Sequence, residues 1–161
     1  MAEVILTVGL PYSGKTTWAM DQGLPIVSPD AVRLAMHGQR FIGQAEPWVW
    51  AQAHAMLDAL VAAGCYRVIV DATNVKPKRR MEWIERHPRL RFSFALFPAT
   101  REECLRRARD AGDTEIRDVI DRQAKEWEAD QLNDWAGATV YGPFGLRGEG
   151  PTVTPQWTGR G

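Results

Sequence analysis

The chain has 161 residues, of which 45% are hydrophobic and 25% are charged, a composition typical of one globular domain with a substantial core. Lys and Arg balance Asp and Glu at 20 each, so bulk charge does not favour a protein that coats nucleic acid. No apolar run is long enough to cross a bilayer, and the N-terminus lacks the basic and apolar segments of a secretory signal. These features predict a cytoplasmic protein without a membrane anchor, and nothing in them indicates an obligate protein partner.

Short β-rich runs alternate with helical segments along the chain. We expect strands at residues 3–8, 25–28, 66–72, 90–97 and 138–142, and helices at residues 15–23, 29–36, 47–64, 76–87, 100–112 and 114–132. Gly and Pro mark several boundaries, and Thr100 with Glu103 is typical of a capping box. The alternation predicts an α/β fold of three layers, with a mostly parallel sheet of about five strands and helices on both faces.

The domain is expected to end near residue 141. Residues 142–161 are rich in Gly and Pro with few aliphatic side chains, which is typical of an irregular tail. The charge is also uneven, because residues 76–109 hold eleven Lys or Arg and four Asp or Glu, a local charge of +7. A basic middle in a neutral chain indicates a local site for a polyanion, although solvated helix faces are the better explanation for most of these residues.

Gly9, Gly14, Lys15 and Thr16 match the spacing of a phosphate-binding loop in full, between a predicted strand and a predicted helix. Glycines let backbone N–H groups approach phosphates, and the following helix directs its positive end at them. In such loops the lysine reaches the outer phosphates and the hydroxyl after it binds Mg²⁺. We therefore predict an ATP and Mg²⁺ site, with Thr16 as the metal ligand. Its expected nucleotide contacts are Gly9, Pro11, Tyr12, Ser13, Gly14, Lys15, Thr16 and Thr17.

A phosphate loop by itself does not separate switches, motors and kinases. The chain has no Asn-Lys-x-Asp guanine-recognition motif, and it is short for a ring ATPase. A P-loop kinase fold is therefore the best class. In such a sheet, polar segments that follow the strands meet at one edge. These segments are residues 9–16, 28–30, 71–74 and 98–100.

Asp30 and Arg33 supply the chemistry that the acceptor side of a kinase needs. A carboxylate there takes the proton of the acceptor hydroxyl, and Arg33 lies one helical turn later on the same face, where it can hold a substrate phosphate. Asp is also favoured as a helix cap, so a purely structural role for Asp30 stays open at this point.

Two further segments add polar groups. Asp71, Thr73 and Asn74 follow a buried strand and precede the basic run that contains Arg79, so we expect them to contact substrate or to orient Mg²⁺ or an arginine. The helix at residues 100–112 carries Arg106, Arg107 and Arg109, and an arginine that closes over the transferred phosphoryl group stabilises its charge. We choose Arg107 for this catalytic role.

Aromatic residues lie between the Asp30 segment and the longest helix. Trp48 and Trp50 are two residues apart and cannot share one helical face, so one is expected to be buried and the other available. Phe41, Trp48 or Trp50 would then stack on a nucleobase, with core packing as the alternative, and we choose Trp48. Trp83, Trp127 and Trp135 are predicted to lie in the core.

The segments ILTVGLPYSGKTTWA, SPDAVR, VIVDATNVKPKRRMEW and EECLRRAR together resemble the kinase domain of bacteriophage-type 5′ polynucleotide kinases. The resemblance covers residues 3–132 and implies Asp30 as general base, Arg33 as ligand of the acceptor phosphate, and Lys15 and Thr16 as ligands of ATP and Mg²⁺. The family's Asp-Thr-Asn segment is Asp71-Ala72-Thr73-Asn74 here, with one residue inserted. The loop at residues 37–50 is more similar to that of short phage kinases, some of which phosphorylate hydroxymethyl groups on DNA bases.

The resemblance implies an ATP-dependent kinase whose acceptor is a nucleic-acid hydroxyl. A 5′-OH end of DNA or RNA comes first, and a hydroxymethylated base such as 5-hydroxymethyluracil in phage DNA comes second. A nucleoside or small-molecule kinase is an alternative, and so is a module that binds nucleotide without transferring phosphate.

Overall fold

The computed structural model describes residues 1–128 and 139–140. Five parallel strands form one sheet in the order β2-β3-β1-β4-β5, which confirms the predicted α/β class. The strands are β1 (Glu3–Gly9), β2 (Ile26–Val27), β3 (Arg67–Val70), β4 (Arg91–Phe97) and β5 (Thr139–Val140). β1 pairs with β3 on one side and with β4 on the other. The strands that precede β4 in the chain therefore lie on one side of β1, and the later strands lie on the other side. Ligand sites of parallel sheets lie at such a switch point, beyond the carboxyl ends of the strands.

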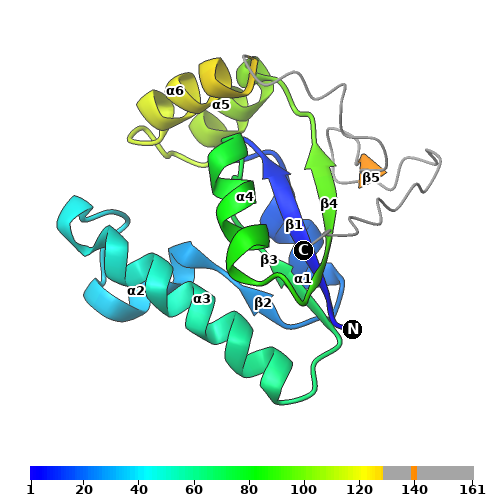
Figure 1. The fold of residues 1–161 in the computed structure, drawn as a ribbon. Helices are drawn as coiled ribbons and strands as arrows, with labels where there is room; N and C mark the ends of the chain where they lie inside the picture. The colour runs from blue at the N-terminus through cyan, green and yellow to red at the C-terminus, as the bar shows by residue number, and fades with distance from the viewer. Residues whose placement is uncertain (129–138, 141–161) are drawn as a thin grey trace.

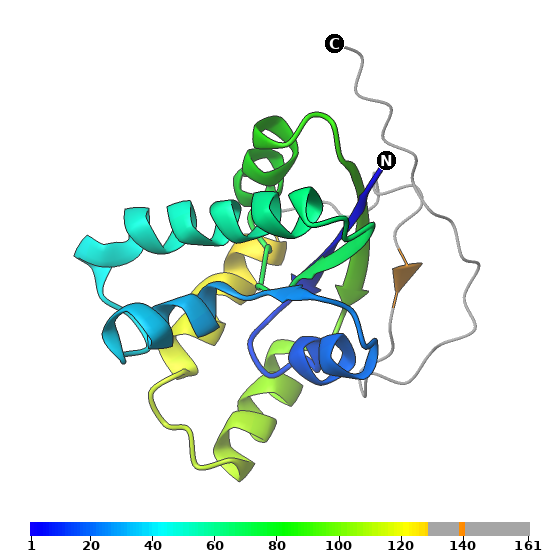
Figure 2. The ribbon, with the colours of Figure 1, turned by 90° about the horizontal axis from the view of Figure 1, so that it is seen from below.

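Helices cover both faces of this sheet (Figures 1 and 2). Alternate side chains of β1 point to opposite faces, and each face has its own packing. Val4 and Leu6 pack with residues of α2 (Pro29–His37), α3 (Glu46–Ala62) and α4 (Pro77–Arg86). Ile5 packs on the opposite face with Trp18 of α1 (Lys15–Asp21).

The third core cluster lies at the carboxyl end of β1, under α5 (Arg101–Asp110) and α6 (Arg117–Glu128). Val8 and Leu10 meet Cys104 of α5 and Ile120 of α6 there, and Figure 1 shows both helices beyond the carboxyl ends of the central strands. The three clusters therefore hold the helices that flank the switch point.

Local signals explain the positions of the helix ends. Ser28 caps α2, because its Oγ accepts a hydrogen bond from the Ala31 backbone N–H at 3.2 Å, and Pro29 occupies the first turn. α2 ends at Gly38, which has a left-handed φ of 71°. The Thr100 side chain caps α5 through the Glu103 backbone N–H. The carboxylate of Glu103 binds Arg106 and Arg107, so this structure forms only half of the expected capping box.

Several predicted boundaries shift by a few residues. The strand expected at residues 66–72 is shorter, because its pairing with β1 ends at Val70 and the polar residues that follow turn toward the site. α6 begins at Arg117 and not at residue 114, since Asp113 is held by contacts to other segments. A short 3-10 turn, Gly43–Ala45, precedes α3 within the predicted loop.

The tryptophans follow the prediction where they are described. Trp83 is fully buried and Trp127 nearly so, while Trp135 lies outside the described residues, as do the predicted tail at residues 142–161 and the end of the sixth predicted helix. No helix in the described part of the chain is both long and apolar enough to cross a membrane.

Candidate active site

The phosphate loop connects β1 to α1 at the switch point. Tyr12 and Gly14 have left-handed φ values of 66° and 98°, which turn the backbone around the loop. Gly9 has no room for a side chain, because a Cβ there would lie 2.7 Å from Ser13 Oγ and 2.8 Å from the Phe97 carbonyl oxygen. This close packing explains why the loop begins with glycine.

Lys15 is folded into the loop. Its side chain is buried, and Nζ donates hydrogen bonds to the Leu10 carbonyl at 2.6 Å and to Ser13 Oγ at 3.3 Å. Burial lowers the Lys15 pKa to about 8. A buried ammonium with only neutral oxygen partners gains by meeting a negative phosphate, so the loop suits the phosphates of a nucleotide.

Thr16 and Asp71 form the second feature of the phosphate side. Thr16 Oγ1 donates to Asp71 Oδ2 at 2.8 Å, although the two residues are 55 positions apart. Burial raises the Asp71 pKa, and the Thr16 hydrogen bond and the nearby Lys15 charge oppose this rise. Asp71 therefore lies beside the phosphate loop, in contact with the predicted metal ligand Thr16.

The Thr16 and Asp71 oxygens fit a magnesium ion. Mg²⁺ prefers oxygen ligands at about 2.0–2.1 Å in octahedral geometry, which places adjacent ligands about 2.9 Å apart. The hydroxyl and the carboxylate form a hydrogen bond of 2.8 Å, so the two oxygens already lie close enough to bind one ion together. One hydroxyl and one carboxylate leave the remaining positions for phosphate oxygens and water.

Thr73 and Asn74 hold the segment after β3 against β1. The Thr73 carbonyl accepts from the Gly9 backbone N–H at 2.9 Å, and Asn74 Nδ2 donates to the Thr7 carbonyl at 2.8 Å. Asn74 has a left-handed φ of 47°, and its buried Oδ1 has no hydrogen-bond partner within the described structure. Both residues line the cleft, and their hydrogen bonds to β1 give them a supporting role beneath the phosphate loop.

Asp30 and Arg33 lie across the cleft from this loop, on the first turns of α2. The Asp30 carboxylate is 84% exposed and accepts from Arg33 Nη1 at 2.6 Å. Since Ser28 fills the capping position, the Asp30 carboxylate is not needed as a helix cap. The predicted pair is therefore present, with its carboxylate open to the cleft.

Glu46 is a member of the site that the sequence analysis missed. It binds Arg33 with two hydrogen bonds, each 2.8 Å long, and it accepts a third from Trp50 Nε1 at 3.1 Å. The Arg33 contacts hold the Glu46 pKa below its ordinary value. A forked pair of this kind fixes the guanidinium plane. The signal in the sequence was the spacing of Glu46 and Trp50, four residues apart at the start of a helix.

Arg79 and Trp50 lie beside Arg33 in the cleft. The Arg79 guanidinium lies 3.7 Å from the Trp50 ring centre and pairs with Glu82 at 2.6 Å. Trp50 and Arg79 both line the cleft. Trp48, which we chose as the stacking residue, is 68% exposed and is not among the residues that line the cleft. The two tryptophans do differ in exposure, because Trp50 is half-buried. Of the two, Trp50 is the one that lies at the site.

Of the three candidate arginines of α5, only Arg107 lines the cleft. Its Nη1 donates to the Tyr12 carbonyl of the phosphate loop at 3.0 Å, and its Nε donates to Glu103 at 3.0 Å. Arg106 is exposed and pairs with Glu103 and Asp110. Residues 98–100, expected at the same edge, do not line the cleft but lead into the helix that carries Arg107.

A second missed feature joins three loops at the mouth of the cleft. Asp113, between α5 and α6, accepts from Tyr12 Oη of the phosphate loop at 2.8 Å and from Arg40 Nη1 at 2.8 Å. Arg40 comes from the loop after α2. These contacts lower the Asp113 pKa well below its ordinary range. They join the phosphate loop, the loop after α2 and the α5–α6 loop.

The cleft enclosed by these segments has a volume of about 980 Å³. Lys15, Thr16 and Asp71 line it together with Asp30 and Arg33, and the Asp30 carboxylate is close enough to raise the pKa of both Lys15 and Asp71. The arrangement can hold a phosphorylated nucleotide on one side and a second substrate on the other.

Comparisons with known proteins agree with this fold. A family described as an AAA domain matches residues 4–133. Two structures of the Pnkp1/Rnl/Hen1 complex, one described as an RNA repair complex, match with TM-scores of 0.70 and 0.60 and identities of 21% and 26%. They cover 80% and 66% of this chain, which spans only 44% and 38% of the matched chains.

A gluconokinase from Sinorhizobium meliloti also matches, with a TM-score of 0.58, 18% identity, and coverage of 87% of this chain and 82% of its own. No curated protein matches the chain. The fold is therefore that of P-loop kinases, and the neighbours do not single out one acceptor.

Proposed function

The chain belongs to the family described as an AAA domain, and we propose that it is an ATP- and Mg²⁺-dependent kinase that phosphorylates a hydroxyl group of a nucleic acid. The observation that carries this proposal is the exposed Asp30 carboxylate, which faces a complete phosphate loop across one cleft and is not used as a helix cap. A module that only binds nucleotide needs no general base, so a carboxylate at this place favours transfer.

On the donor side, Lys15 and the backbone N–H groups of the loop hold the nucleotide phosphates, and the N-terminus of α1 adds its positive dipole. Thr16 and Asp71 would hold Mg²⁺, which would neutralise phosphate charge when bound. Arg107 approaches from α5 and reaches the loop at the Tyr12 carbonyl. A guanidinium at this place stabilises the charge of the transferred phosphoryl group.

On the acceptor side, Arg33 binds a phosphate of the acceptor. That phosphate takes the place of Asp30 on Arg33, while Glu46 keeps the guanidinium oriented. The released Asp30 carboxylate then takes the proton of the acceptor hydroxyl, while the hydroxyl oxygen attacks the terminal phosphorus of ATP. The bond from that phosphorus to the bridging oxygen breaks, and ADP leaves.

Charge and exposure favour a nucleic acid over a neutral sugar. Seven cationic and four acidic side chains line the cleft, a net charge of +3. The cations are Lys15, Arg33, Arg40, Lys76, Arg79, Arg107 and Arg122, and the acids are Asp30, Glu46, Asp71 and Glu126. Phe41 and Leu34 line the same cleft and are 64% and 60% exposed, which suits contact with unstacked bases.

The comparisons support the same choice, since the neighbours include an RNA repair complex and the sequence resembles polynucleotide kinases. A 5′-OH end is the first acceptor to test, and a hydroxymethylated base is the second. Both place a hydroxyl near a phosphodiester that Arg33 can bind.

The test is transfer from γ-labelled ATP to a panel of acceptors. The panel contains 5′-OH strands of DNA and RNA, duplexes with hydroxymethyl bases, nucleosides and gluconate. We expect label on a nucleic acid and none on gluconate. Label on small molecules alone would assign a small-molecule kinase, and release of free phosphate without any labelled acceptor would assign a nucleotide-dependent binding module.

A further inference from the structure

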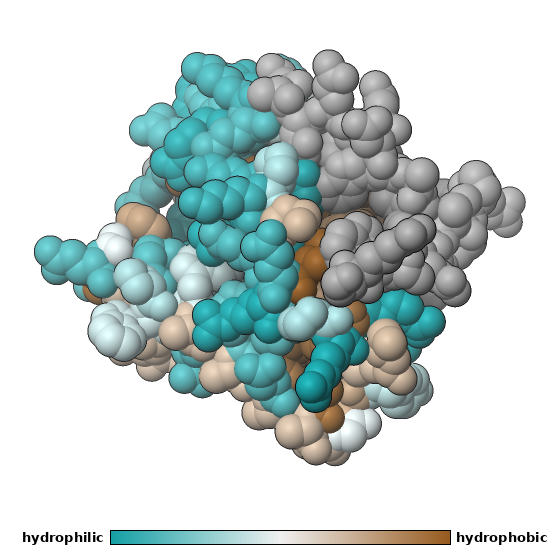
Figure 3. Space-filling model, viewed as in Figure 1, coloured by the Kyte–Doolittle hydropathy of each residue, from teal (hydrophilic) through white to brown (hydrophobic). Residues whose placement is uncertain are grey.

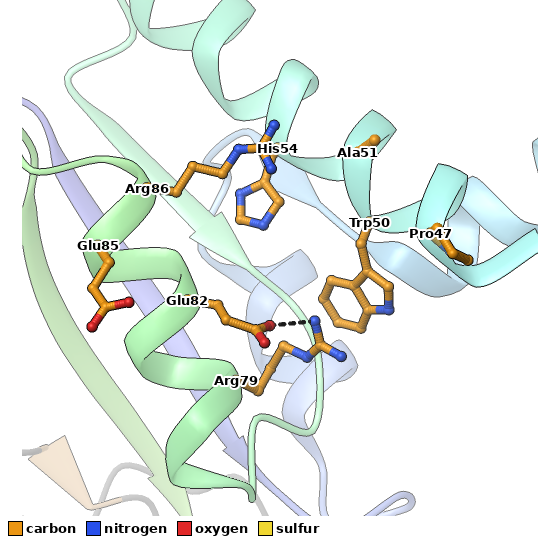
Figure 4. A pocket seen from close by; sticks show the side chains of 8 residues that line it. All are labelled: Pro47, Trp50, Ala51, His54, Arg79, Glu82, Glu85 and Arg86. Carbon is orange, nitrogen blue, oxygen red and sulfur yellow. Dashed lines mark hydrogen bonds and ion pairs between the residues drawn. The ribbon is translucent and has the colours of Figure 1, made fainter.

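A second pocket, here called the α3–α4 pocket, lies between α3 and α4, beside the cleft (Figure 4). Its volume of about 440 Å³ falls within the range of small-molecule sites, about 300–1,000 Å³. The polar and aromatic side chains that line it are Trp50, His54, Arg79, Glu82, Glu85 and Arg86. None of the chemistry described above uses His54, Glu85 or Arg86.

His54 is buried, and its side chain points from α3 into this pocket (Figure 4). His54 Nδ1 lies 2.9 Å from His87 Nε2, and His87 Nδ1 lies 3.0 Å from the Asp58 carboxylate. A carboxylate accepts, so His87 Nδ1 carries a proton, His87 Nε2 accepts from His54 Nδ1, and His54 Nε2 keeps its lone pair. The chain of hydrogen bonds thus presents a fixed acceptor to the pocket. Burial lowers the His54 pKa to about 4, which keeps the ring neutral near neutral pH.

The charges around the pocket cancel. Two guanidinium groups, Arg79 and Arg86, face two carboxylates, Glu82 and Glu85, and Glu82 is already paired with Arg79. A phosphate gains little from such balanced surroundings. A neutral planar group with donors and acceptors on its edge fits better, because the pocket combines guanidinium donors with carboxylate and imidazole acceptors, beside the Trp50 indole on which Arg79 stacks. Nucleobases have this chemistry and bind proteins by stacking on aromatic and guanidinium groups.

The α3–α4 pocket adjoins the cleft, since Trp50 and Arg79 line both. Arg33 lies within 5.9 Å of the Trp50 ring centre, and Arg79 lies 3.7 Å from that centre. Figure 3 shows that the surface over α4 is predominantly hydrophilic. Such a surface suits contact with a nucleic-acid strand. A strand whose phosphate binds Arg33 therefore reaches the pocket by passing Trp50 and Arg79.

We propose that the α3–α4 pocket binds the nucleobase of the nucleotide that follows the acceptor nucleotide in the strand. The acceptor residues Asp30 and Arg33 then hold the first nucleotide, and the pocket holds the second base. The acceptor His54 Nε2 favours a base with an exocyclic amino group, such as adenine or cytosine, over thymine. This inference rests on the proposed nucleic-acid kinase function.

The test blocks the pocket without touching the cleft. Ala51 lines the pocket on the exposed side of α3, so Ala51→Trp fills it. Ala59→Trp places the same side chain at an exposed position of α3 outside the pocket and is the matched control. Each protein is assayed with 5′-OH strands that carry adenine, thymine or no base at the second nucleotide, and melting temperatures confirm that both variants fold.

For the wild type and Ala59→Trp, removal of the second adenine should raise the acceptor KM about tenfold, the loss expected for one stacked base. Thymine should fall between adenine and the abasic strand. Ala51→Trp should already show the raised KM with adenine, and the abasic change should then add little. The ATP KM should not move in any case.

The subsite and the proposed function fail in different ways. The subsite alone would be overturned if strands are labelled but the acceptor KM does not depend on the second base. It would also be overturned if Ala51→Trp responds to base removal like the wild type. A wild type that labels small molecules and no strand would overturn the proposed function and the subsite together.

Discussion

Glu46→Gln tests whether Arg33 must be held in one orientation to bind the acceptor. Glu46 and Arg33 have side chains that are only 18% and 14% exposed, so water screens their two hydrogen bonds weakly. Glutamine keeps the shape and one acceptor oxygen but loses the charge and one of the two Arg33 bonds. A hydrogen bond to a charged group contributes about 1.5–3 kcal/mol, so unfolding free energy should fall by about that amount.

The kinetic effect should appear on the acceptor alone. A misplaced guanidinium that loses about 1.4 kcal/mol of acceptor binding raises the acceptor KM about tenfold, while the ATP KM should stay the same because Lys15 and Thr16 are untouched. Transfer from γ-labelled ATP to a 5′-OH strand measures both constants. Glu3→Gln is the control, since Glu3 pairs with Arg67 at 3.2 Å at the opposite end of the sheet, and it should leave both constants unchanged.

The pH dependence of stability gives a second readout. The pKa of Glu46 is lowered from 4.5 in the folded protein, so its contribution is present above 4.5 and is lost as the pH falls through the folded pKa. The stability difference between wild type and Glu46→Gln should therefore be full at pH 7 and shrink below about pH 4.5. An unchanged acceptor KM in Glu46→Gln would refute the orienting role of Glu46.

The remaining predictions concern the phosphate side. Lys15→Ala should abolish transfer and keep the fold, as activity and melting temperature together will show. Because the Lys15 pKa is lowered to about 8 and phosphates favour its charged form, ATP binding should take up a proton near pH 9 and none near pH 6.5, and calorimetry in buffers of different ionisation enthalpy will detect it. Without ATP, the same shift should make the wild type more stable as the pH rises from 8 toward 10.5, since the unfolded chain then binds more protons. Asp71→Asn should raise the Mg²⁺ concentration needed for half-maximal rate and leave nucleotide binding without metal unchanged. Arg107→Ala should lower kcat about a hundredfold or more in single-turnover assays, and a normal kcat would remove Arg107 from the mechanism.

The parts of the site that are encoded by local patterns could be predicted from sequence. The phosphate loop depends on the spacing of Gly9, Gly14, Lys15 and Thr16, and the strand before it and the helix after it are both present. Asp30 and Arg33 are neighbours on one helical turn, so their pairing follows from helix geometry. The order of strands and helices was likewise sufficient for the fold class.

The parts that depend on distant contacts could not be predicted. Arg40 and Asp113 are 73 residues apart, and Tyr12 and Asp113 are 101 apart, so no local pattern connects them. Glu46 was missed because its partner Arg33 lies on the preceding helix. The choice of Trp48 over Trp50 depended on how α3 is rotated on the sheet, which is set by packing that the sequence pattern does not specify.

The most direct test of the central claim is Asp30→Asn. Asparagine keeps the size of the side chain and can still accept from Arg33, and Ser28 caps the helix, so melting temperature and ATP affinity should be nearly unchanged. Loss of a general base typically lowers the rate about 10²–10⁴-fold. We predict a kcat at least about a hundredfold lower for transfer to a 5′-OH strand, with both substrates still bound. A near-normal kcat in a folded variant would contradict the account, because Glu46, the carboxylate that shares Arg33 with Asp30, is held by two hydrogen bonds from that arginine.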